Sequence, residues 1–172
     1  TNLRDLAYSY IEKDSPSKQQ IKTYLLKKYL KKFQGSKSKR DISAIIDKIV
    51  LNLEKNRLID DRLYSDSKAR VFLRRGYSIN KIGIALRTKG ITAENIRSSI
   101  EKLKEDKPDP DFNSAMKICK KKRIGPLRPE ANREIFYKKD MGILARSGFS
   151  YDTSKKILSM SQKEFNQLYK LI

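Results

Sequence analysis

Few side chains in this chain of 172 residues carry the chemistry that enzymes use. The sequence contains no histidine, so the commonest general base is absent, and the lone cysteine, Cys119, has no histidine to activate its thiol. Asp60 and Asp61 are adjacent carboxylates, but neighbours at a helix start point in different directions, and a helix cap is the simpler interpretation. There is no Cys/His cluster for zinc and no glycine-rich phosphate loop. The sequence therefore predicts a protein that is not an enzyme, with no catalytic residue, metal site or cofactor.

Basic side chains dominate the chemistry of the chain. The formal net charge is +20 at pH 7, and a field of that size attracts polyanions such as nucleic acid, an acidic membrane surface or an acidic protein. Basic and acidic residues are separated along the sequence: residues 15–40 contain nine basic residues, residues 67–93 contain seven, and neither stretch contains an acid. A directed basic surface requires such separation, although lysines spread over a solvated surface would also explain the charge.

Basic residues on two predicted helices and in one predicted loop are candidates for contact with a polyanion. Arg70 and Arg74 are four residues apart and share a helix face, and a basic tetrad at residues 120–123 lies beside Gly125 and Pro126. For the tetrad the functional interpretation is a flexible polyanion clamp, and for every candidate the alternative is a solvated basic surface. The full set of candidates is Arg70, Arg74, Arg75, Lys81, Arg87, Lys89, Lys120, Lys121, Lys122, Arg123 and Arg146.

Helical periodicity extends over nearly the whole chain and must position these residues. The clearest apolar stripe comprises Ile42, Ile45, Ile46, Ile49 and Leu53, and Leu63 and Tyr64 are expected to be buried on the next helix. Tyrosines beside basic residues, such as Tyr10 and Tyr24, are expected to pack on apolar stripes rather than to stack on nucleic-acid bases. Helix ends are predicted at Gly76, Gly90 and Gly148, and N-caps at Ser15 (with Pro16 at the first helical position), Asp41, Ser78, Thr92 and Ser161.

One helix pattern occurs three times along the chain. It is most complete at residues 78–91, shorter at residues 141–149 and degenerate at residues 17–29. When Leu86 is aligned with Leu144, Gly90 coincides with Gly148, and this glycine ending is less generic than the chance likeness of amphipathic helices. Units of this size bury too little surface to be stable alone, so they must stack.

We therefore predict an all-α fold of three tandem three-helix repeats, stacked into an elongated molecule. The predicted repeats are residues 1–59 (with an inserted loop near 31–40), residues 60–109 and residues 110–172. No apolar run approaches the length of a membrane span, no signal peptide is visible at Thr1, and a single cysteine cannot form an intramolecular disulfide. These features predict a cytoplasmic protein.

A specific series of residues in the middle of the chain is similar to a known family. An aliphatic pair precedes two acids, and the order is then Leu58-Ile-Asp-Asp61, Ala69-Arg70, Arg75-Gly76 and Leu86-Arg-Thr-Lys-Gly-Ile91. This order resembles the central repeat of the RecX family, bacterial regulatory proteins that modulate the RecA recombinase. The resemblance extends more weakly over nearly all of the chain, with two departures: Tyr29 replaces the glycine in the first unit, and Ser147 stands in the last unit where Lys89 stands in the central one.

The resemblance implies tandem three-helix repeats in an extended, curved molecule without catalytic residues or a cofactor. It also implies binding along the groove of the RecA–DNA filament and inhibition of recombination, ATPase and co-protease activities, with effects on DNA repair and the SOS response. The expected partners are the RecA filament and single- or double-stranded DNA, not a membrane. A repeat array need not oligomerise, so a monomer is expected. The alternative is a stand-alone basic helical protein that binds DNA or RNA.

Overall fold

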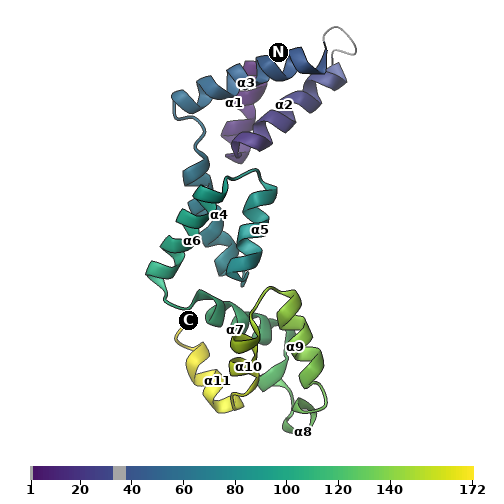
Figure 1. Ribbon diagram of the computed structural model, residues 1–172, viewed down its shortest axis with the longest axis vertical. Coiled ribbons are helices and arrows are strands. Elements are labelled where there is room, and N and C mark those ends of the chain that lie inside the picture. Colours follow the sequence, from purple (N-terminus) through teal and green to yellow (C-terminus); the bar gives the residue numbers. More distant parts are fainter. Residues whose placement is uncertain (1, 33–37) are drawn as a thin grey trace. The chain divides into compact units, whose positions relative to one another are not determined.

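The regular elements of the protein are helices. The computed structural model describes residues 2–32 and 38–172, and no strand occurs among them, which confirms the predicted all-α class (Figure 1). The loop predicted near residues 31–40 falls mainly on residues 33–37, which lie outside the described residues. The α-helices are α1 (Leu3–Asp14), α2 (Lys18–Lys32), α3 (Lys39–Lys55), α4 (Asp61–Arg74), α5 (Ile79–Thr88), α6 (Ala93–Asp106), α7 (Pro110–Lys122), α8 (Glu130–Arg133), α9 (Tyr137–Arg146), α10 (Tyr151–Leu158) and α11 (Gln162–Tyr169), and a 3-10 helix, η1 (Gly125–Leu127), follows α7.

The chain divides into two compact units. Unit 1 comprises residues 1–67 and 86–97, and unit 2 comprises residues 68–85 and 98–172. The boundaries between them fall inside α4, α5 and α6, so the predicted middle repeat contributes residues to both units. The division into three repeats at residues 59/60 and 109/110 stays a prediction.

Unit 1 has its core between the apolar faces of α1, α2 and α3. Ile21 and Leu25 of α2 are fully buried and form one cluster with Ile42 and Ile46 of α3. Ile45 packs against this cluster from a half-buried position, so the predicted stripe on α3 is confirmed. Side chains at helical spacing thus bring three amphipathic helices together by burial of apolar surface.

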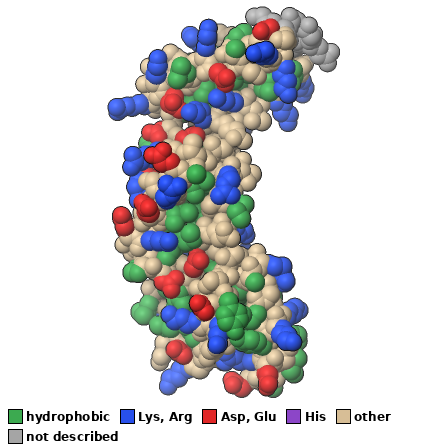
Figure 2. Space-filling view, viewed as in Figure 1, with side chains coloured by type: hydrophobic (Ala, Val, Ile, Leu, Met, Phe, Trp, Pro, Cys, Tyr) green, Lys and Arg blue, Asp and Glu red, His purple; other side chains and the backbone are tan. Residues whose placement is uncertain are grey.

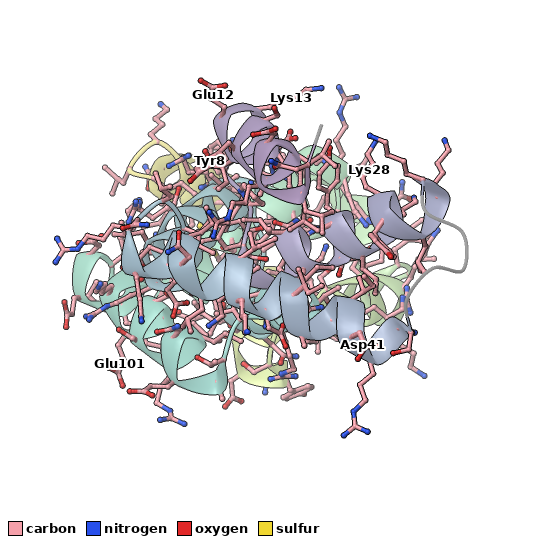
Figure 3. All side chains as sticks on the ribbon, turned by 90° about the horizontal axis from the view of Figure 1, so that it is seen from above. Tyr8, Glu12, Lys13, Lys28, Asp41 and Glu101 are labelled. Atoms are coloured by element: carbon pink, nitrogen blue, oxygen red, sulfur yellow. The ribbon has the colours of Figure 1, made fainter. Side chains whose placement is uncertain are left out.

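The outer faces of these three helices carry polar and charged side chains. Tyr8, Glu12 and Lys13 are exposed on α1 and point away from the core (Figure 3). Lys28 on α2 and Asp41 near the start of α3 are exposed in the same way (Figure 3). This alternation of buried and exposed positions is the pattern from which the helices were predicted.

Unit 2 has a second core, formed by α7, α9, α10 and α11. Met116 and Cys119 of α7, Leu144 of α9, Ile157 of α10 and Phe165 of α11 are all fully buried and belong to one cluster. Cys119 is therefore an apolar packing residue, as predicted. Burial raises the pKa of its thiol to about 12, so the reactive thiolate is not populated at neutral pH.

Two predicted helix starts are wrong. Ser15 has a left-handed backbone (φ 43°) and ends α1, and Ser17 instead caps α2. Ser38, not Asp41, caps α3: its hydroxyl accepts from the main-chain N–H of Asp41 at 3.2 Å and donates to the Asp41 carboxylate at 2.7 Å. In both cases the serine that caps the helix also donates a hydrogen bond to a side chain three residues later, Ser17 to Gln20 and Ser38 to Asp41. This second hydrogen bond stabilises the helix start more than a single capping bond would.

The other predicted helix ends are confirmed. Ser78, Thr92 and Ser161 each accept a hydrogen bond from a main-chain N–H three residues later. The helix-ending glycines have positive φ angles, at Gly76 (89°), Gly90 (82°) and Gly148 (92°).

One buried position on α4 is predicted incorrectly. Leu63 is 66% exposed, whereas Tyr64 is buried as predicted. Asp60 caps the helix by accepting from the main-chain N–H groups of Arg62 and Leu63 at 2.9 and 3.1 Å. A helix that starts at this cap turns Leu63 toward solvent and the next residue toward the core.

Within unit 1, the start of α2 is joined to the end of α5. The Ser17 hydroxyl donates a hydrogen bond to the carbonyl oxygen of Lys89 at 2.8 Å. The main-chain N–H of Lys18 donates to the carboxylate of Asp61 at 2.8 Å, so a helix N-terminus is satisfied by an acid from another helix. We call these contacts the unit 1 joint.

Within unit 2, the start of α5 is joined to the end of α9 in the same way. The Ser78 hydroxyl donates to the carbonyl oxygen of Ser147 at 2.8 Å. The main-chain N–H of Ile79 donates to the carboxylate of Asp111 at 2.7 Å. We call these contacts the unit 2 joint. The same joint in two places is consistent with tandem repeats of one helical unit.

A glycine makes each joint sterically possible. A Cβ atom added at Gly90 would lie 2.4 Å from the Cβ of Gln19. A Cβ atom added at Gly148 would lie 2.5 Å from the hydroxyl oxygen of Ser78. Both glycines thus have two requirements, a left-handed backbone and room for the neighbouring helix start, which explains the repeated glycine ending of the sequence pattern.

Candidate polyanion-binding surface

Two of the candidate arginines line a hollow in unit 2. Arg70 and Arg74 come from successive turns of α4, and Lys107, just after α6, and Lys117 of α7 complete the basic lining. The hollow has a volume of about 190 Å³. We call it the basic pocket, and its other lining residues are Leu73, Leu103, Asp106, Pro110, Asn113 and Ser114.

The charges of the basic pocket are poorly compensated. Four cations face one carboxylate, that of Asp106. Lys117 is half-buried, and its pKa is lowered first by this burial and then by the nearby charge of Lys107. An arrangement of this kind attracts anions, because an anion would offset the repulsion among the cations.

Arg75 does not line this pocket, whereas two residues outside the predicted set do. Lys107 and Lys117 lie outside the two acid-free stretches named above, residues 15–40 and 67–93, and outside the basic tetrad. Helical spacing could have found the second one, since Pro110, Ser114 and Lys117 recur at i, i+4 and i+7 on α7 and share a face.

The candidates on α5 lie elsewhere. The Lys81 amino group is 4.1 Å from the ring centroid of Tyr77, which is stacked on Phe72, so this cation already interacts with an aromatic face. Arg87, near the end of α5, and Lys89, just after it, lie in unit 1, and Arg87 is exposed. Of these three candidates, Lys81 is in the same unit as Arg70 and Arg74, and it does not line their pocket.

Lys89 lines a second hollow, in unit 1, together with Lys27. This hollow has a volume of about 340 Å³ and includes the rings of Tyr10 and Tyr24. The two rings stack on each other with centroids 4.3 Å apart, and the Lys28 amino group lies 5.5 Å from the Tyr24 ring centroid. Because these ring faces already have partners, the geometry favours the predicted packing role over stacking on bases.

The basic tetrad at residues 120–123 is not in a loop, contrary to the prediction. Its three lysines form the last turn of α7, and Arg123 ends that helix with a left-handed backbone (φ 54°). The next segment is held by buried Asp140, whose carboxylate accepts two bonds from Arg128, each 2.8 Å, and one from the Gly125 N–H at 2.9 Å. Cations are also favourable at a helix C-terminus, because they interact with the helix dipole. The tetrad is therefore presented by a helix end.

The remaining candidates, Arg75 and Arg146, are exposed at the ends of α4 and α9. On the face shown in Figure 2, Lys and Arg side chains occur throughout both units with Asp and Glu side chains among them. The charge separation along the sequence thus does not produce an acid-free basic surface on that face of either unit. The basic pocket is instead the place where four cations come together.

Metal-binding and membrane-spanning features are absent from the described part of the chain. Among residues 2–32 and 38–172, no group of three or more His, Cys, Asp or Glu side chains is placed to hold a metal ion. None of the helices described in these ranges combines the length and the apolar character that a membrane crossing requires.

Two curated proteins are similar to this chain over most of its length. It is 30% identical over 161 residues to the regulatory protein RecX of Myxococcus xanthus (strain DK1622), a match that covers 92% of this chain and 84% of that protein. It is 22% identical over 161 residues to the regulatory protein RecX of Agrobacterium fabrum (strain C58 / ATCC 33970), covering 94% of this chain and 84% of that protein. No model of a known protein family matches the chain.

A solved structure shares the fold. The crystal structure of a regulatory protein RecX superposes with a TM-score of 0.62 at 24% identity, covering 92% of this chain and 72% of the other. The helical fold shared with this structure and the 30% identity to the Myxococcus xanthus protein agree with one another. The protein is therefore a regulator rather than an enzyme, and the chain belongs to the RecX family of regulatory proteins.

Proposed function

We propose that this protein binds the filament that the RecA recombinase forms on DNA and inhibits its recombination, ATPase and co-protease activities. Membership of the RecX family supports the regulatory role. The observation that carries the proposal is the basic pocket of unit 2, where Arg70, Arg74, Lys107 and Lys117 converge against a single carboxylate. A DNA-containing filament is a polyanion, and such a pocket is complementary to it.

The rest of the charge supports this role over a longer range. A net charge of +20 steers the protein toward the filament, and this attraction weakens as salt screens it. Exposed basic groups outside the pocket, such as Arg87 and the tetrad at residues 120–123, supply further contacts to phosphate or to acidic protein surface. Each phosphate contact on duplex DNA makes the slope of log affinity against log salt steeper by about 0.9.

The test is the DNA-dependent ATPase activity of RecA at increasing amounts of this protein. Sub-stoichiometric wild-type protein should slow ATP hydrolysis and strand exchange, and unchanged rates at saturation would contradict the proposal. The double substitution Arg70→Glu and Arg74→Glu should weaken inhibition about tenfold or more, because it reverses two charges at the contact. The matched control, Lys13→Glu with Lys28→Glu, reverses two exposed charges on α1 and α2 and should change inhibition less than about twofold.

A stand-alone nucleic-acid-binding protein is the second candidate. The basic pocket supports this second function, because its four cations attract phosphate whether or not a recombinase is present. Binding to naked single-stranded and duplex DNA at physiological salt separates the two functions. Tight binding there, with no effect on RecA activity, would replace the regulatory proposal with this one.

We also propose that the protein acts as a monomer in the cytoplasm, where the RecA filament forms. Each joint requires a serine cap on one helix and a glycine on the other. In the outer repeats, Tyr29 stands where that glycine would be, and Phe136 starts α9 without a side-chain cap. Neither α2 nor α9 thus has the residue that a further joint of this kind would need, and sedimentation should show one monomeric species.

A further inference from the structure

The basic pocket has features of a discrete binding site beyond general positive charge. Its cations come from three separate segments: Arg70 and Arg74 from α4, Lys107 from the segment between α6 and α7, and Lys117 from α7. Because α4 is distant in sequence from the other two segments, only the fold of unit 2 brings the four groups together. Arg75, the neighbour of Arg74 on the same helix, does not line the pocket.

Apolar surface forms part of the pocket wall. Leu103 and Pro110 are buried and Leu73 is half-buried, so the cations, of which Lys117 is half-buried and the other three are exposed, line a space with one apolar wall. In such a space the attraction between a cation and an anion is stronger than in bulk water. The depressed pKa of Lys117, caused by burial and by Lys107, agrees with this environment.

The cations of the pocket have no partner within the described chain. Over residues 2–32 and 38–172, no ion pair or hydrogen bond joins the side chain of Arg70, Arg74, Lys107 or Lys117 to another residue. The one carboxylate of the lining, Asp106, is exposed and offsets a single charge. An anion with more than one charge would relieve the remaining repulsion.

The chemistry of the lining fits a phosphate group better than a carboxylate. A phosphate has several acceptor oxygens arranged around a tetrahedron, and it can accept from two arginines and two lysines that approach from different segments. Asn113 and Ser114 add neutral donors to the same wall. A carboxylate is planar, carries one charge and has two oxygens, so it would leave part of this donor set unused.

We propose that the basic pocket of unit 2 is a binding site for one phosphate group, either free or within a nucleic-acid strand. The inference deepens the proposed function, since a filament-bound strand is one source of such a group. The site itself can be tested on the whole protein without recombinase. Failure of the site and failure of RecA inhibition are therefore separate results.

The probe is inorganic phosphate, added at constant ionic strength maintained with chloride and followed by two-dimensional NMR of the full chain. Saturable shifts of the Arg74 and Lys117 amides are expected, with a dissociation constant on the order of 1 mM. Arg74→Gln and Lys117→Gln should each weaken binding about tenfold, since each removes a charge-assisted hydrogen bond. Arg75→Gln is the matched control and should change binding less than about twofold.

Three results would overturn the proposal. Shifts that do not saturate, or an equal loss of binding in Arg75→Gln, would indicate diffuse attraction to a basic helix. Equal binding of acetate would show that the pocket selects carboxylates, as in an acidic peptide, rather than phosphate. Unfolding of the variants is checked in the same spectra, and Lys107→Gln supplies an independent variant on a segment outside the helices.

Competition then identifies the source of the phosphate group. If a short oligothymidylate strand binds wild-type protein, loses affinity in Arg74→Gln and is displaced by inorganic phosphate, the group is a strand phosphodiester. If inorganic phosphate binds while strand affinity is the same in wild-type protein and Arg74→Gln, the pocket holds a free phosphate. Both results support a phosphate site and assign its ligand.

Discussion

Units 1 and 2 have the same joint but different electrostatic anchors. In unit 1, Lys18 at the start of α2 also pairs with Glu54 at 2.9 Å, and both side chains are about 40% exposed (40% and 42%). In unit 2 the corresponding helix start has the apolar Ile79. An ion pair elsewhere in that unit, Arg128–Asp140, has side chains 17% and 1% exposed. Unit 1 thus combines its joint with solvated charge, and unit 2 contains buried charge.

The comparison separates the contacts that both joints share from the ion pairs, which differ between the two units. Both joints need a serine hydroxyl that donates to a helix-end carbonyl, an acid that accepts from a helix-start N–H, and a glycine with positive φ. The ion pairs of the two units differ in burial. An exposed ion pair contributes little to the free energy of unfolding, whereas removal of one partner from a buried pair leaves the other charge desolvated and destabilises the folded state strongly. The variants below test this distinction.

Removal of the buried carboxylate should have the largest effect. Asp140→Ala leaves Arg128 without its partner and the Gly125 N–H without its acceptor, so we expect a loss of about 3–5 kcal/mol in the unfolding free energy of unit 2. The matched change in unit 1, Glu54→Ala, breaks the exposed pair with Lys18 and should cost about 0–1 kcal/mol. Urea unfolding followed by circular dichroism measures both, and similar losses for the two variants would refute the contrast.

The glycines of the joints come next. Gly90→Ala forces a left-handed alanine, at about 1–2 kcal/mol, and also pushes against the Cβ of Gln19, so a total of about 2–5 kcal/mol is expected. Gly148→Ala has the same backbone cost and displaces the Ser78 hydroxyl from its hydrogen bond to Ser147, for a total of about 2–3 kcal/mol.

Gly76→Ala is the control for both glycine variants. Its φ is also positive (89°), but an added Cβ would have no neighbour nearer than 3.5 Å. It should therefore show the backbone cost alone, about 1–2 kcal/mol. If all three variants lose the same stability in urea unfolding, the close approach at the joints has no energetic role.

Cys119 can report which unit has been weakened. Its thiol is fully buried in unit 2 and has a pKa of about 12, so a thiol reagent at about pH 8 reacts only when unit 2 opens. Gly148→Ala should accelerate labelling at least tenfold, as a loss of about 2 kcal/mol implies, and Gly90→Ala should leave the rate nearly unchanged. Equal acceleration by both variants would mean that the two units open together.

The helices and their ends could be predicted from sequence because their signals are local. The stripe on α3, the glycines at residues 76, 90 and 148, and the cap at Ser78 each depend on residues within a turn or two. The cap at Ser15 was wrong because two serines flank Pro16, and only the pairing of Ser17 with Gln20 decides between them.

The joints and the basic pocket could not be predicted from the same signals. The hydrogen bond from Ser17 to Lys89 spans 72 residues and that from Ser78 to Ser147 spans 69, so the partners follow from how helices stack and not from any local pattern. Likewise, Lys117 enters the pocket through the placement of α7, which depends on the burial of Met116 and Cys119 in the core of unit 2.

The smallest effect is expected at the acid of the unit 2 joint. Burial raises the pKa of Asp111 above its ordinary 3.8, although the hydrogen bond from the Ile79 N–H opposes the shift. The folded state therefore binds the Asp111 proton more tightly than the unfolded state does. The protonated group stabilises the fold at low pH, and this contribution is lost as the pH rises through the pKa of the folded state. Asp111→Asn keeps an acceptor for Ile79 and removes the buried charge, so near pH 7 its urea midpoint should equal or slightly exceed that of wild type, by about 0.5 kcal/mol or less. A clear loss of stability near pH 7 would show instead that the joint requires the negative charge at the helix start, as the helix dipole favours.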